Sequence, residues 1–224
     1  MKVCTDACIL GAYADVANGS PARILDIGTG TGLLALMAAQ RNPLATVDAI
    51  EVDEAAFEQA MENVAASNLS ERPAIDRVRV IPGRVQDFEP ASSYDRILTN
   101  PPFYTNHLRS PTAAVNRALH TDELPFPELV DSVIRLLQQD GQWWVLLPPY
   151  ETESLVALTT TVGLMPFQQL HVRHNDRKPV FRIITGFAHA LQSLVTDTLT
   201  IHDSTDNTYT PAFRSLLRDF YLMF

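Results

Sequence analysis

The stretch LDIGTGTG, residues 25–32, decides the fold of this chain. It places three of the nine glycines, Gly28, Gly30 and Gly32, within five residues. An apolar run that is typical of a buried strand precedes it, and an apolar run long enough for a helix follows it. Because glycine has no side chain, a ligand can approach the backbone closely at such a strand-to-helix turn. The stretch therefore predicts a ligand-binding turn.

Strand-like and helix-like segments alternate on both sides of this turn. Short apolar runs predict the strands ARILDI (22–27), TVDAIEV (46–52), RVRVI (77–81), YDRILTN (94–100) and QWWVLLP (142–148). Apolar residues at helical spacing predict helices over 32–41, about 54–67, 127–141 with Gly141 as its stop, and about 151–162. This alternation is typical of an α/β, Rossmann-like fold with a mainly parallel, doubly wound sheet.

The C-terminal part of the chain has a different pattern. Two strands are predicted over 164–173 and 180–189, joined by the polar, basic loop HNDRKP. We expect them to form an antiparallel hairpin at the end of the parallel sheet. The chain has 224 residues and neither a repeat nor a long linker, so we expect residues 1–224 to form a single domain.

The composition excludes several classes of protein. Apolar residues make up 46% and charged residues 19%, which is ordinary for a globular chain. The longest apolar runs, such as Leu33–Ala39, are far shorter than the ~18–20 residues that span a bilayer. Asp6 interrupts the only stretch that resembles a signal peptide, so we expect a cytoplasmic protein without membrane contact. The composition leaves the oligomeric state open, and we favour a monomer.

Two acidic residues are candidates to bind a ligand at the glycine turn. Glu51 ends the next strand, 19 residues after Gly32, where a carboxylate accepts hydrogen bonds from ribose hydroxyls in folds of this kind. The third glycine comes two residues after the second, not three as in a dinucleotide fingerprint. With no diphosphate to seat, Asp26 fits better with a cationic, methionine-bearing cofactor. The alternative is a tight turn beside a solvated acid.

The tetrapeptide Asn100-Pro101-Pro102-Phe103 follows the fourth strand at the carboxyl edge of the sheet, where ligands bind in this topology. Two successive prolines fix the backbone and remove two N–H donors. The Asn100 side-chain oxygen and the Pro101 carbonyl can then accept both hydrogens of a planar, conjugated –NH2 group. Phe103 offers a face on which a base can stack. Taken alone, the tetrapeptide could equally mark an ordinary loop.

Other candidates carry weaker signals. Asp87, after the third strand, is placed to accept a hydrogen bond from a cofactor adenine, although a surface carboxylate explains it nearly as well. Thr5 belongs to an opening segment that could close over the methionine end of the cofactor or stay solvated. Trp143 and Trp144 are expected to be structural. The six histidines have no metal-type spacing beyond His171-x-x-His174, so we predict no metal site.

One strongly basic stretch, residues 171–182, stands out in a chain whose net charge is −9. It carries Arg173, Arg177, Lys178 and Arg182 against a single acid. Such a stretch is commonly a solvated hairpin tip. In an acidic protein it is also the best candidate for contact with RNA phosphates.

Together, LDIGTGTG, Glu51, Asp87 and NPPF resemble the class I S-adenosylmethionine-dependent methyltransferases that act on amino groups. Three further segments narrow the resemblance to the bacterial tRNA methyltransferases that modify N6 of adenine 37 in a valine tRNA: the opening MKVCTDACILGAY, the Arg-Lys-Pro-x-x-Arg stretch (177–182) and the ending FRSLLRDFYL. The resemblance implies S-adenosyl-L-methionine as cofactor and tRNA as partner. It also implies that the target adenine leaves its stack to enter the NPPF site.

The motifs alone leave other functions open. Guanine N2 of ribosomal RNA and a protein glutamine amide also present a planar, conjugated –NH2 group to NPPF. A non-catalytic module that binds S-adenosylmethionine or RNA is a different class of alternative. An intact NPPF beside an intact glycine turn disfavours it, because a binding module needs only one of them.

Overall fold

A computed structural model of the chain describes residues 4–69, 72, 73, 77–101 and 124–224. Within these ranges eight strands form one sheet in the order β10-β8-β9-β7-β6-β1-β2-β5. The strands are β1 (Arg23–Ile27), β2 (Thr46–Glu51), β5 (Val78–Pro82), β6 (Tyr94–Thr99), β7 (Leu137–Leu147), β8 (Met165–Arg173), β9 (Val180–Ala188) and β10 (Val195–Thr200). A separate antiparallel pair joins β3 (Asn68–Leu69) and β4 (Arg72–Pro73).

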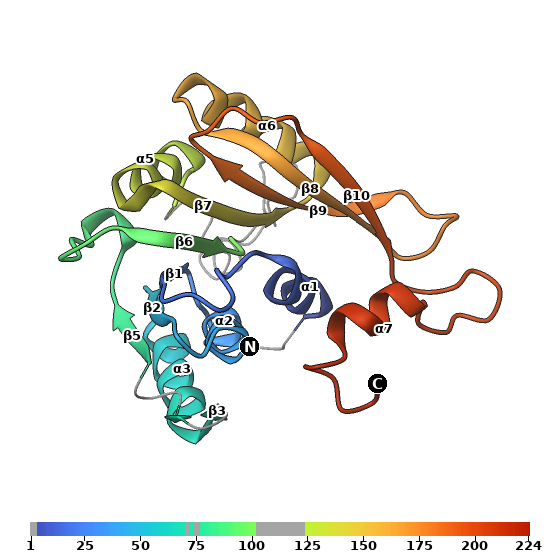
Figure 1. The fold of residues 1–224 in the computed structure, drawn as a ribbon, viewed down its shortest axis with the longest axis horizontal. Helices are drawn as coiled ribbons and strands as arrows, with labels where there is room; N and C mark the ends of the chain where they lie inside the picture. Colours follow the sequence, from blue (N-terminus) through green and yellow to red (C-terminus); the bar gives the residue numbers. More distant parts are fainter. Residues whose placement is uncertain (1–3, 70–71, 74–76, 102–123) are drawn as a thin grey trace, which may run out of the picture.

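The main sheet is parallel through its first five strands in sequence. β5, β2, β1, β6 and β7 all run in the same direction, and β9 then runs antiparallel to both β7 and β8. This arrangement confirms the predicted α/β fold with a C-terminal antiparallel hairpin (Figure 1). The sequence analysis missed β10, which pairs in parallel with the outer side of β8. Its first four residues are exposed, so it carries no apolar alternation that could reveal a strand.

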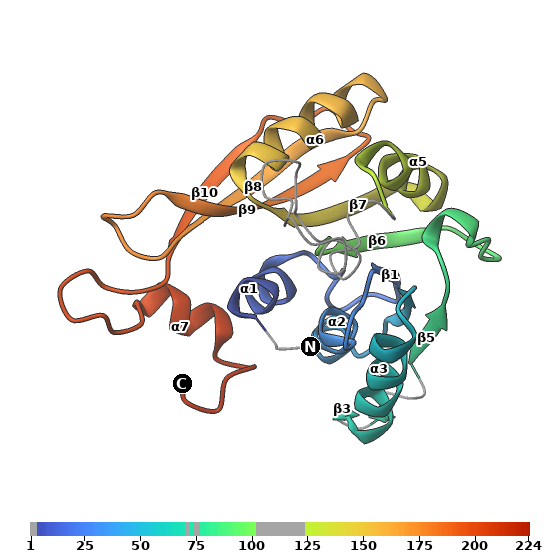
Figure 2. The ribbon, with the colours of Figure 1, turned by 180° about the vertical axis from the view of Figure 1, so that it is seen from behind.

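Helices cover both faces of the sheet. On one face lie α1 (Thr5–Tyr13), α2 (Leu33–Arg41), α3 (Glu54–Ala66) and α7 (Pro211–Leu217), and on the other lie α5 (Phe126–Leu136) and α6 (Pro149–Thr161). Figure 2 shows the same two layers from behind. Each face has its own apolar core, and adjacent residues of β7 point to opposite sides of the sheet. Trp144 fills one core and Trp143 the other, which confirms their structural role.

The predicted helix over 127–141 is wrong at its C-terminal end. Helix α5 stops at Leu136, and Leu137 already pairs with Tyr94 of β6. The pairing then jumps to Arg96 and Gln142, so the residues between form a bulge. A side chain at Gly141 would come within 2.7 Å of the Leu137 side chain. The glycine therefore allows the bulge to close on Leu137 and does not end the helix.

Candidate functional site

The site is built where three neighbouring parallel strands end. Ile27 of β1 pairs with Ile50 of β2 on one side and with Thr99 of β6 on the other. The residues that follow these positions therefore meet at the same edge of the sheet, which is where ligands bind in this topology. The sheet register thus brings the glycine turn, Glu51 and Asn100 together, as the sequence predicts.

The glycine turn depends on backbone angles that other residues rarely adopt. Gly28, Gly30 and Gly32 have φ values of +68°, +58° and +84°. The N–H groups of Gly28 and Thr29 both donate to the carbonyl of Ile50, at 3.0 Å each. The turn is therefore tied to β2 before α2 begins, and a side chain at any of the three glycines would strain it.

Glu51 holds this turn in place. It is only 8% exposed, and its Oε2 accepts a hydrogen bond from the Gly30 N–H at 2.7 Å. Its Oε1 accepts from the N–H groups of Val52 and Asp53, at 3.0 Å each. Oε1 thereby uses both of its lone pairs, whereas Oε2 still has room for a further donor such as a hydroxyl. Sequence reasoning missed this structural role, because it depends on a contact across 21 residues.

Asp26 lies fully buried beneath the turn. Its Oδ2 accepts hydrogen bonds from the Thr29 hydroxyl and from the Ala35 N–H at the start of α2. Its Oδ1 is buried without a hydrogen-bond partner among the described residues. Burial raises the pKa of Asp26 to about 7. A buried acceptor without a donor is costly, so Oδ1 fits a donor that a ligand supplies.

Asn100 directly follows β6 and carries a second unmet acceptor. Its Oδ1 is also buried and has no hydrogen-bond partner within the described part of the chain. The strand end beneath it is held in place, because Thr99 Oγ1 accepts a hydrogen bond from the Trp143 indole at 3.1 Å. Pro101 follows and is buried, whereas Pro102 and Phe103 lie outside the described residues.

Asp87 lies at the outer end of the same edge. It ends the 3₁₀ helix η2 (Val85–Asp87), which follows β5, and its side chain is exposed. The guanidinium of Arg135 on α5 donates to the carbonyls of Val85, at 2.9 Å, and of Phe88. No local sequence pattern reveals this brace, which holds η2 against the layer of α5.

Thr5 begins α1 and is exposed. Its side chain hydrogen-bonds with Tyr221 near the C-terminus, and burial raises the pKa of that tyrosine to about 12. This hydrogen bond ties the start of α1 to the C-terminal segment.

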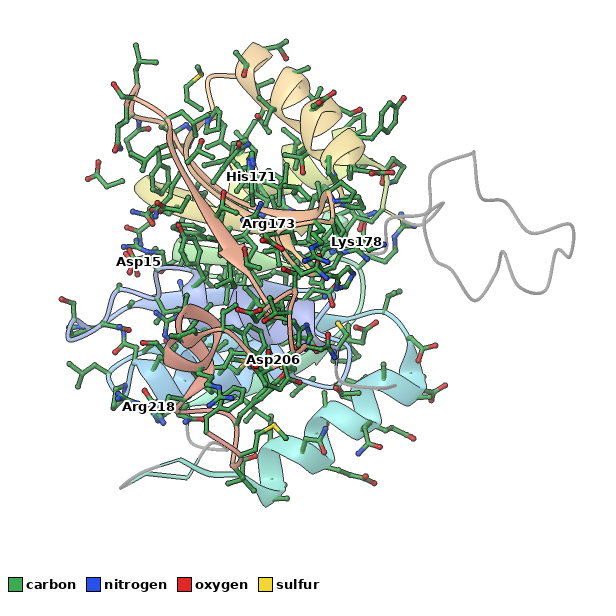
Figure 3. All side chains as sticks on the ribbon, turned by 90° about the vertical axis from the view of Figure 1, so that its right-hand side faces the viewer. Asp15, His171, Arg173, Lys178, Asp206 and Arg218 are labelled. Carbon is green, nitrogen blue, oxygen red and sulfur yellow. The ribbon has the colours of Figure 1, made fainter. Side chains whose placement is uncertain are left out.

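The basic residues of the hairpin fall into two groups. Arg177 and Lys178 are exposed at the tip between β8 and β9, whereas Arg173 and Arg182 are half-buried on the strands. The Arg173 Nε donates to Thr200 Oγ1 at 2.8 Å, and the Arg182 Nε donates to the carboxylate of Asp6 at 2.9 Å. Figure 3 shows Arg173 and Lys178 on the hairpin, in the half of the molecule away from Arg218.

Two further predictions concern metals and membranes. Within the described ranges, no group of three or more His, Cys, Asp or Glu side chains is arranged to hold a metal ion. His107 and His120 lie outside those ranges. None of the helices in the described part of the chain has the length and apolar character needed to cross a membrane.

Solved structures with the same architecture are methyltransferases. A predicted O-methyltransferase from Agrobacterium tumefaciens superposes with a TM-score of 0.73 at 16% identity and covers 96% of both chains. A putative RNA methyltransferase from Pyrococcus horikoshii superposes with a TM-score of 0.56 at 16% identity, covering 83% of this chain and 82% of its own. At this identity they show the fold alone, which is Rossmann-like and shared with methyltransferases.

Sequence comparison identifies the family. Residues 15–158 match the Methyltransferase small domain. A Dyadobacter fermentans protein named tRNA1(Val) (adenine(37)-N6)-methyltransferase is 42% identical over 100% of this chain and 92% of its own length. A Pseudoalteromonas translucida protein of the same name is 36% identical over 99% of this chain and 92% of its own. The chain belongs to the methyltransferase family that carries this name.

Proposed function

We propose that this protein transfers a methyl group from S-adenosyl-L-methionine to the exocyclic N6 of an adenine in tRNA, adenine 37 of a valine tRNA. The observation that carries the proposal is the buried, unmet acceptor of Asn100 at the strand end beside the glycine turn. An acceptor in that position suits a planar amine, and the names of the relatives supply the substrate.

The glycine turn and its acidic partners are proposed to hold the cofactor. When bound, S-adenosyl-L-methionine supplies an electrophilic methyl group on a sulfonium. Gly28, Gly30 and Gly32 let it approach the backbone, and the spare lone pair on Glu51 Oε2 accepts from a ribose hydroxyl. The unmet Oδ1 of Asp26 accepts from the methionine end. Asp87 is assigned to the adenine amino group and Thr5 to the closing segment at the methionine end.

The catalytic role is proposed for Asn100-Pro101-Pro102-Phe103. The Asn100 Oδ1 accepts one hydrogen of the target amine, and the Pro101 carbonyl accepts the other. This withdraws the nitrogen lone pair from ring conjugation and aims it at the methyl carbon. The N–C bond forms as the S–C bond breaks, and the alkylated amine then loses its proton to water. Pro102 keeps competing donors away, and Phe103 stacks on the base.

Catalysis here is mostly positioning and electrostatics. Because the amine becomes strongly acidic once it is alkylated, its proton can pass to water, and the transfer needs no dedicated general base.

The basic hairpin is proposed to bind tRNA phosphates through Arg173, Arg177, Lys178 and Arg182. The two exposed cations at the tip are free to move toward a phosphate, whereas Arg182 must exchange Asp6 for one. We further propose that residues 1–224 act as one domain, as a monomer, and in the cytoplasm where tRNA is found.

In the decisive test, the protein is incubated with labelled S-adenosyl-L-methionine and one of three substrates: tRNA, ribosomal RNA or a protein extract. Nucleoside digestion of the product then identifies the modified base. We expect N6-methyladenosine in tRNA and no label in the other two substrates. Label in guanosine or in protein would keep the mechanism and replace the substrate. Cofactor binding without transfer to any substrate would favour the non-catalytic alternative.

A further inference from the structure

Two aromatic rings lie flat against each other at the base of the basic hairpin tip. The rings of His174 and Phe181 have centroids 4.0 Å apart and planes within 7° of parallel. His174 is exposed and directly follows β8, whereas Phe181 is half-buried in β9 and packs against the core of that face. One face of the imidazole therefore rests on a ring anchored in the protein, and its exposed area lies on the remaining face and edges.

Neighbouring residues hold both Phe181 and the backbone of His174 in place. The Arg182 guanidinium lies 5.4 Å from the centroid of the Phe181 ring, and Asp6 on α1 holds Arg182 through an ion pair at 2.9 Å. The His174 carbonyl accepts a hydrogen bond from the His202 N–H at 2.9 Å, which continues the pairing of β10 with β8. The backbone that carries the imidazole is therefore fixed by β9 on one side and by β10 and His202 on the other.

The stack lies at the edge of the sheet that carries the proposed methyl-transfer site. Leu147 of β7 pairs with Ile183 of β9, and Val145 of β7 pairs with Thr99 of β6. Phe181, two residues before Ile183, therefore lies past the end of β7, at the sheet edge where Asn100 follows β6. Strands are ~4.8 Å apart, so β9 lies about 10 Å across the sheet from β6.

We propose that His174, laid on Phe181, is a stacking platform for an unpaired base of the substrate RNA. The inference rests on the proposed function and adds a contact to the base that flanks the reacting nucleotide. Arg177 and Lys178 lie on the same tip and hold the phosphates of the stacked nucleotide. Rings and cations gathered on one tip match single-stranded RNA, which offers base faces and phosphates together.

Charge supports the choice of partner. The chain carries a net charge of −9, yet residues 171–182 contain four arginines and lysines against one acid. A chain with a net negative charge repels a polyanion on the whole, so a locally basic tip is a favoured point of contact. A ring at the base of that tip can contact a base of the RNA while the neighbouring cations contact its phosphates.

Binding of RNA to the full chain tests the platform independently of methyl transfer. The probes are a stem-loop with an unpaired seven-base loop and a fully paired duplex of the same length, both unmodified and followed by fluorescence polarisation. We expect His174→Ala to weaken stem-loop binding about 5- to 150-fold, the range for one stacked base, and to leave duplex binding unchanged. His174→Phe restores a flat ring and should bind within about twofold of the unmodified protein.

His189→Ala is the matched control, because His189 directly follows the other end of β9, at the opposite edge of the sheet. It should bind both probes like the unmodified protein. Equal stem-loop affinity for the His174→Ala and His189→Ala variants would overturn the platform, and so would a His174→Phe variant as weak as His174→Ala. The Tm of each variant and its affinity for S-adenosyl-L-methionine show whether it is folded.

The outcomes separate this inference from the proposed function. A platform that binds the stem-loop through His174 while the protein fails to methylate tRNA would refute the proposed function alone. Methylation of tRNA that is indifferent to His174 would refute the platform alone.

Discussion

The glycine turn and the basic hairpin lie at the same edge of the sheet but are built in opposite ways. At the turn, Glu51 and Asp26 are buried, and their carboxylates accept five hydrogen bonds from nearby backbone and hydroxyl groups. At the hairpin tip, Arg177 and Lys178 are exposed. The first region fixes a geometry in advance, whereas the second offers charge that adapts to its partner. Substitutions at the turn should therefore damage cofactor binding or stability, and those at the tip only RNA binding.

The largest effect is expected at Asn100. Asn100→Ala removes the buried acceptor that aligns the target amine, so kcat should fall about 100- to 1000-fold, as for the loss of one catalytic hydrogen-bonding group. S-adenosyl-L-methionine affinity, measured by calorimetry, should stay within about twofold. A loss of cofactor binding together with activity would contradict the assigned role.

Asp26 should make the unfolding free energy depend on pH. Burial raises its pKa from 3.8 to about 7 in the folded chain. Below pH 4 both states are protonated at this group and its stabilising effect is complete. As the pH rises through 7 the folded state must ionise a buried carboxylate, and this contribution is lost.

Asp26→Asn serves as the comparison for this titration, because the amide cannot ionise. Without cofactor, the unmodified protein should lose up to about 4 kcal/mol relative to the variant between pH 4 and 8. Urea unfolding across this range measures the difference. A difference that does not change with pH would show that Asp26 keeps its ordinary pKa.

Glu51→Ala should loosen the glycine turn. It leaves the N–H groups of Gly30, Val52 and Asp53 without their acceptor. Each such group that is buried costs about 1–3 kcal/mol of stability. Both the unfolding free energy and the cofactor affinity should therefore fall.

Asp53→Ala is the matched control for Glu51→Ala. Asp53 caps α3 by accepting from the Ala56 N–H, so its loss costs about 1 kcal/mol of stability. Cofactor affinity should not change. Equal losses of affinity in the two variants would mean that Glu51 acts only through general stability.

The smallest effect on the folded protein is expected at the hairpin tip. Arg177→Ala combined with Lys178→Ala should leave Tm and cofactor affinity unchanged, because both side chains are exposed. The slope of log affinity for tRNA against log salt should fall by about 1 for each phosphate that the variant no longer neutralises. Arg218→Ala removes an exposed cation from the other half of the molecule and should not change that slope. An unchanged slope in the double variant would move the tRNA surface elsewhere.

Local sequence signals predicted most of the elements that position the site. The glycine turn, its flanking strand and helix, and the strand end at Asn100 all lie within short windows of sequence, where spacing and residue type determine the backbone. The boundary between α5 and β7 was not predictable in this way, since Leu137 continues the helical pattern and joins the sheet only because Tyr94 pairs with it.

The sequence by itself therefore determined the class of fold, the glycine turn and the identity of the residues at the strand ends. Tertiary structure alone decided which groups these residues contact. Glu51 reaches back to Gly30, Arg135 braces η2, and Asp6 holds Arg182 across 176 residues. The physical reason is that a backbone conformation depends mainly on neighbouring residues, whereas the partner of a buried polar group depends on sheet register and on which helix covers it.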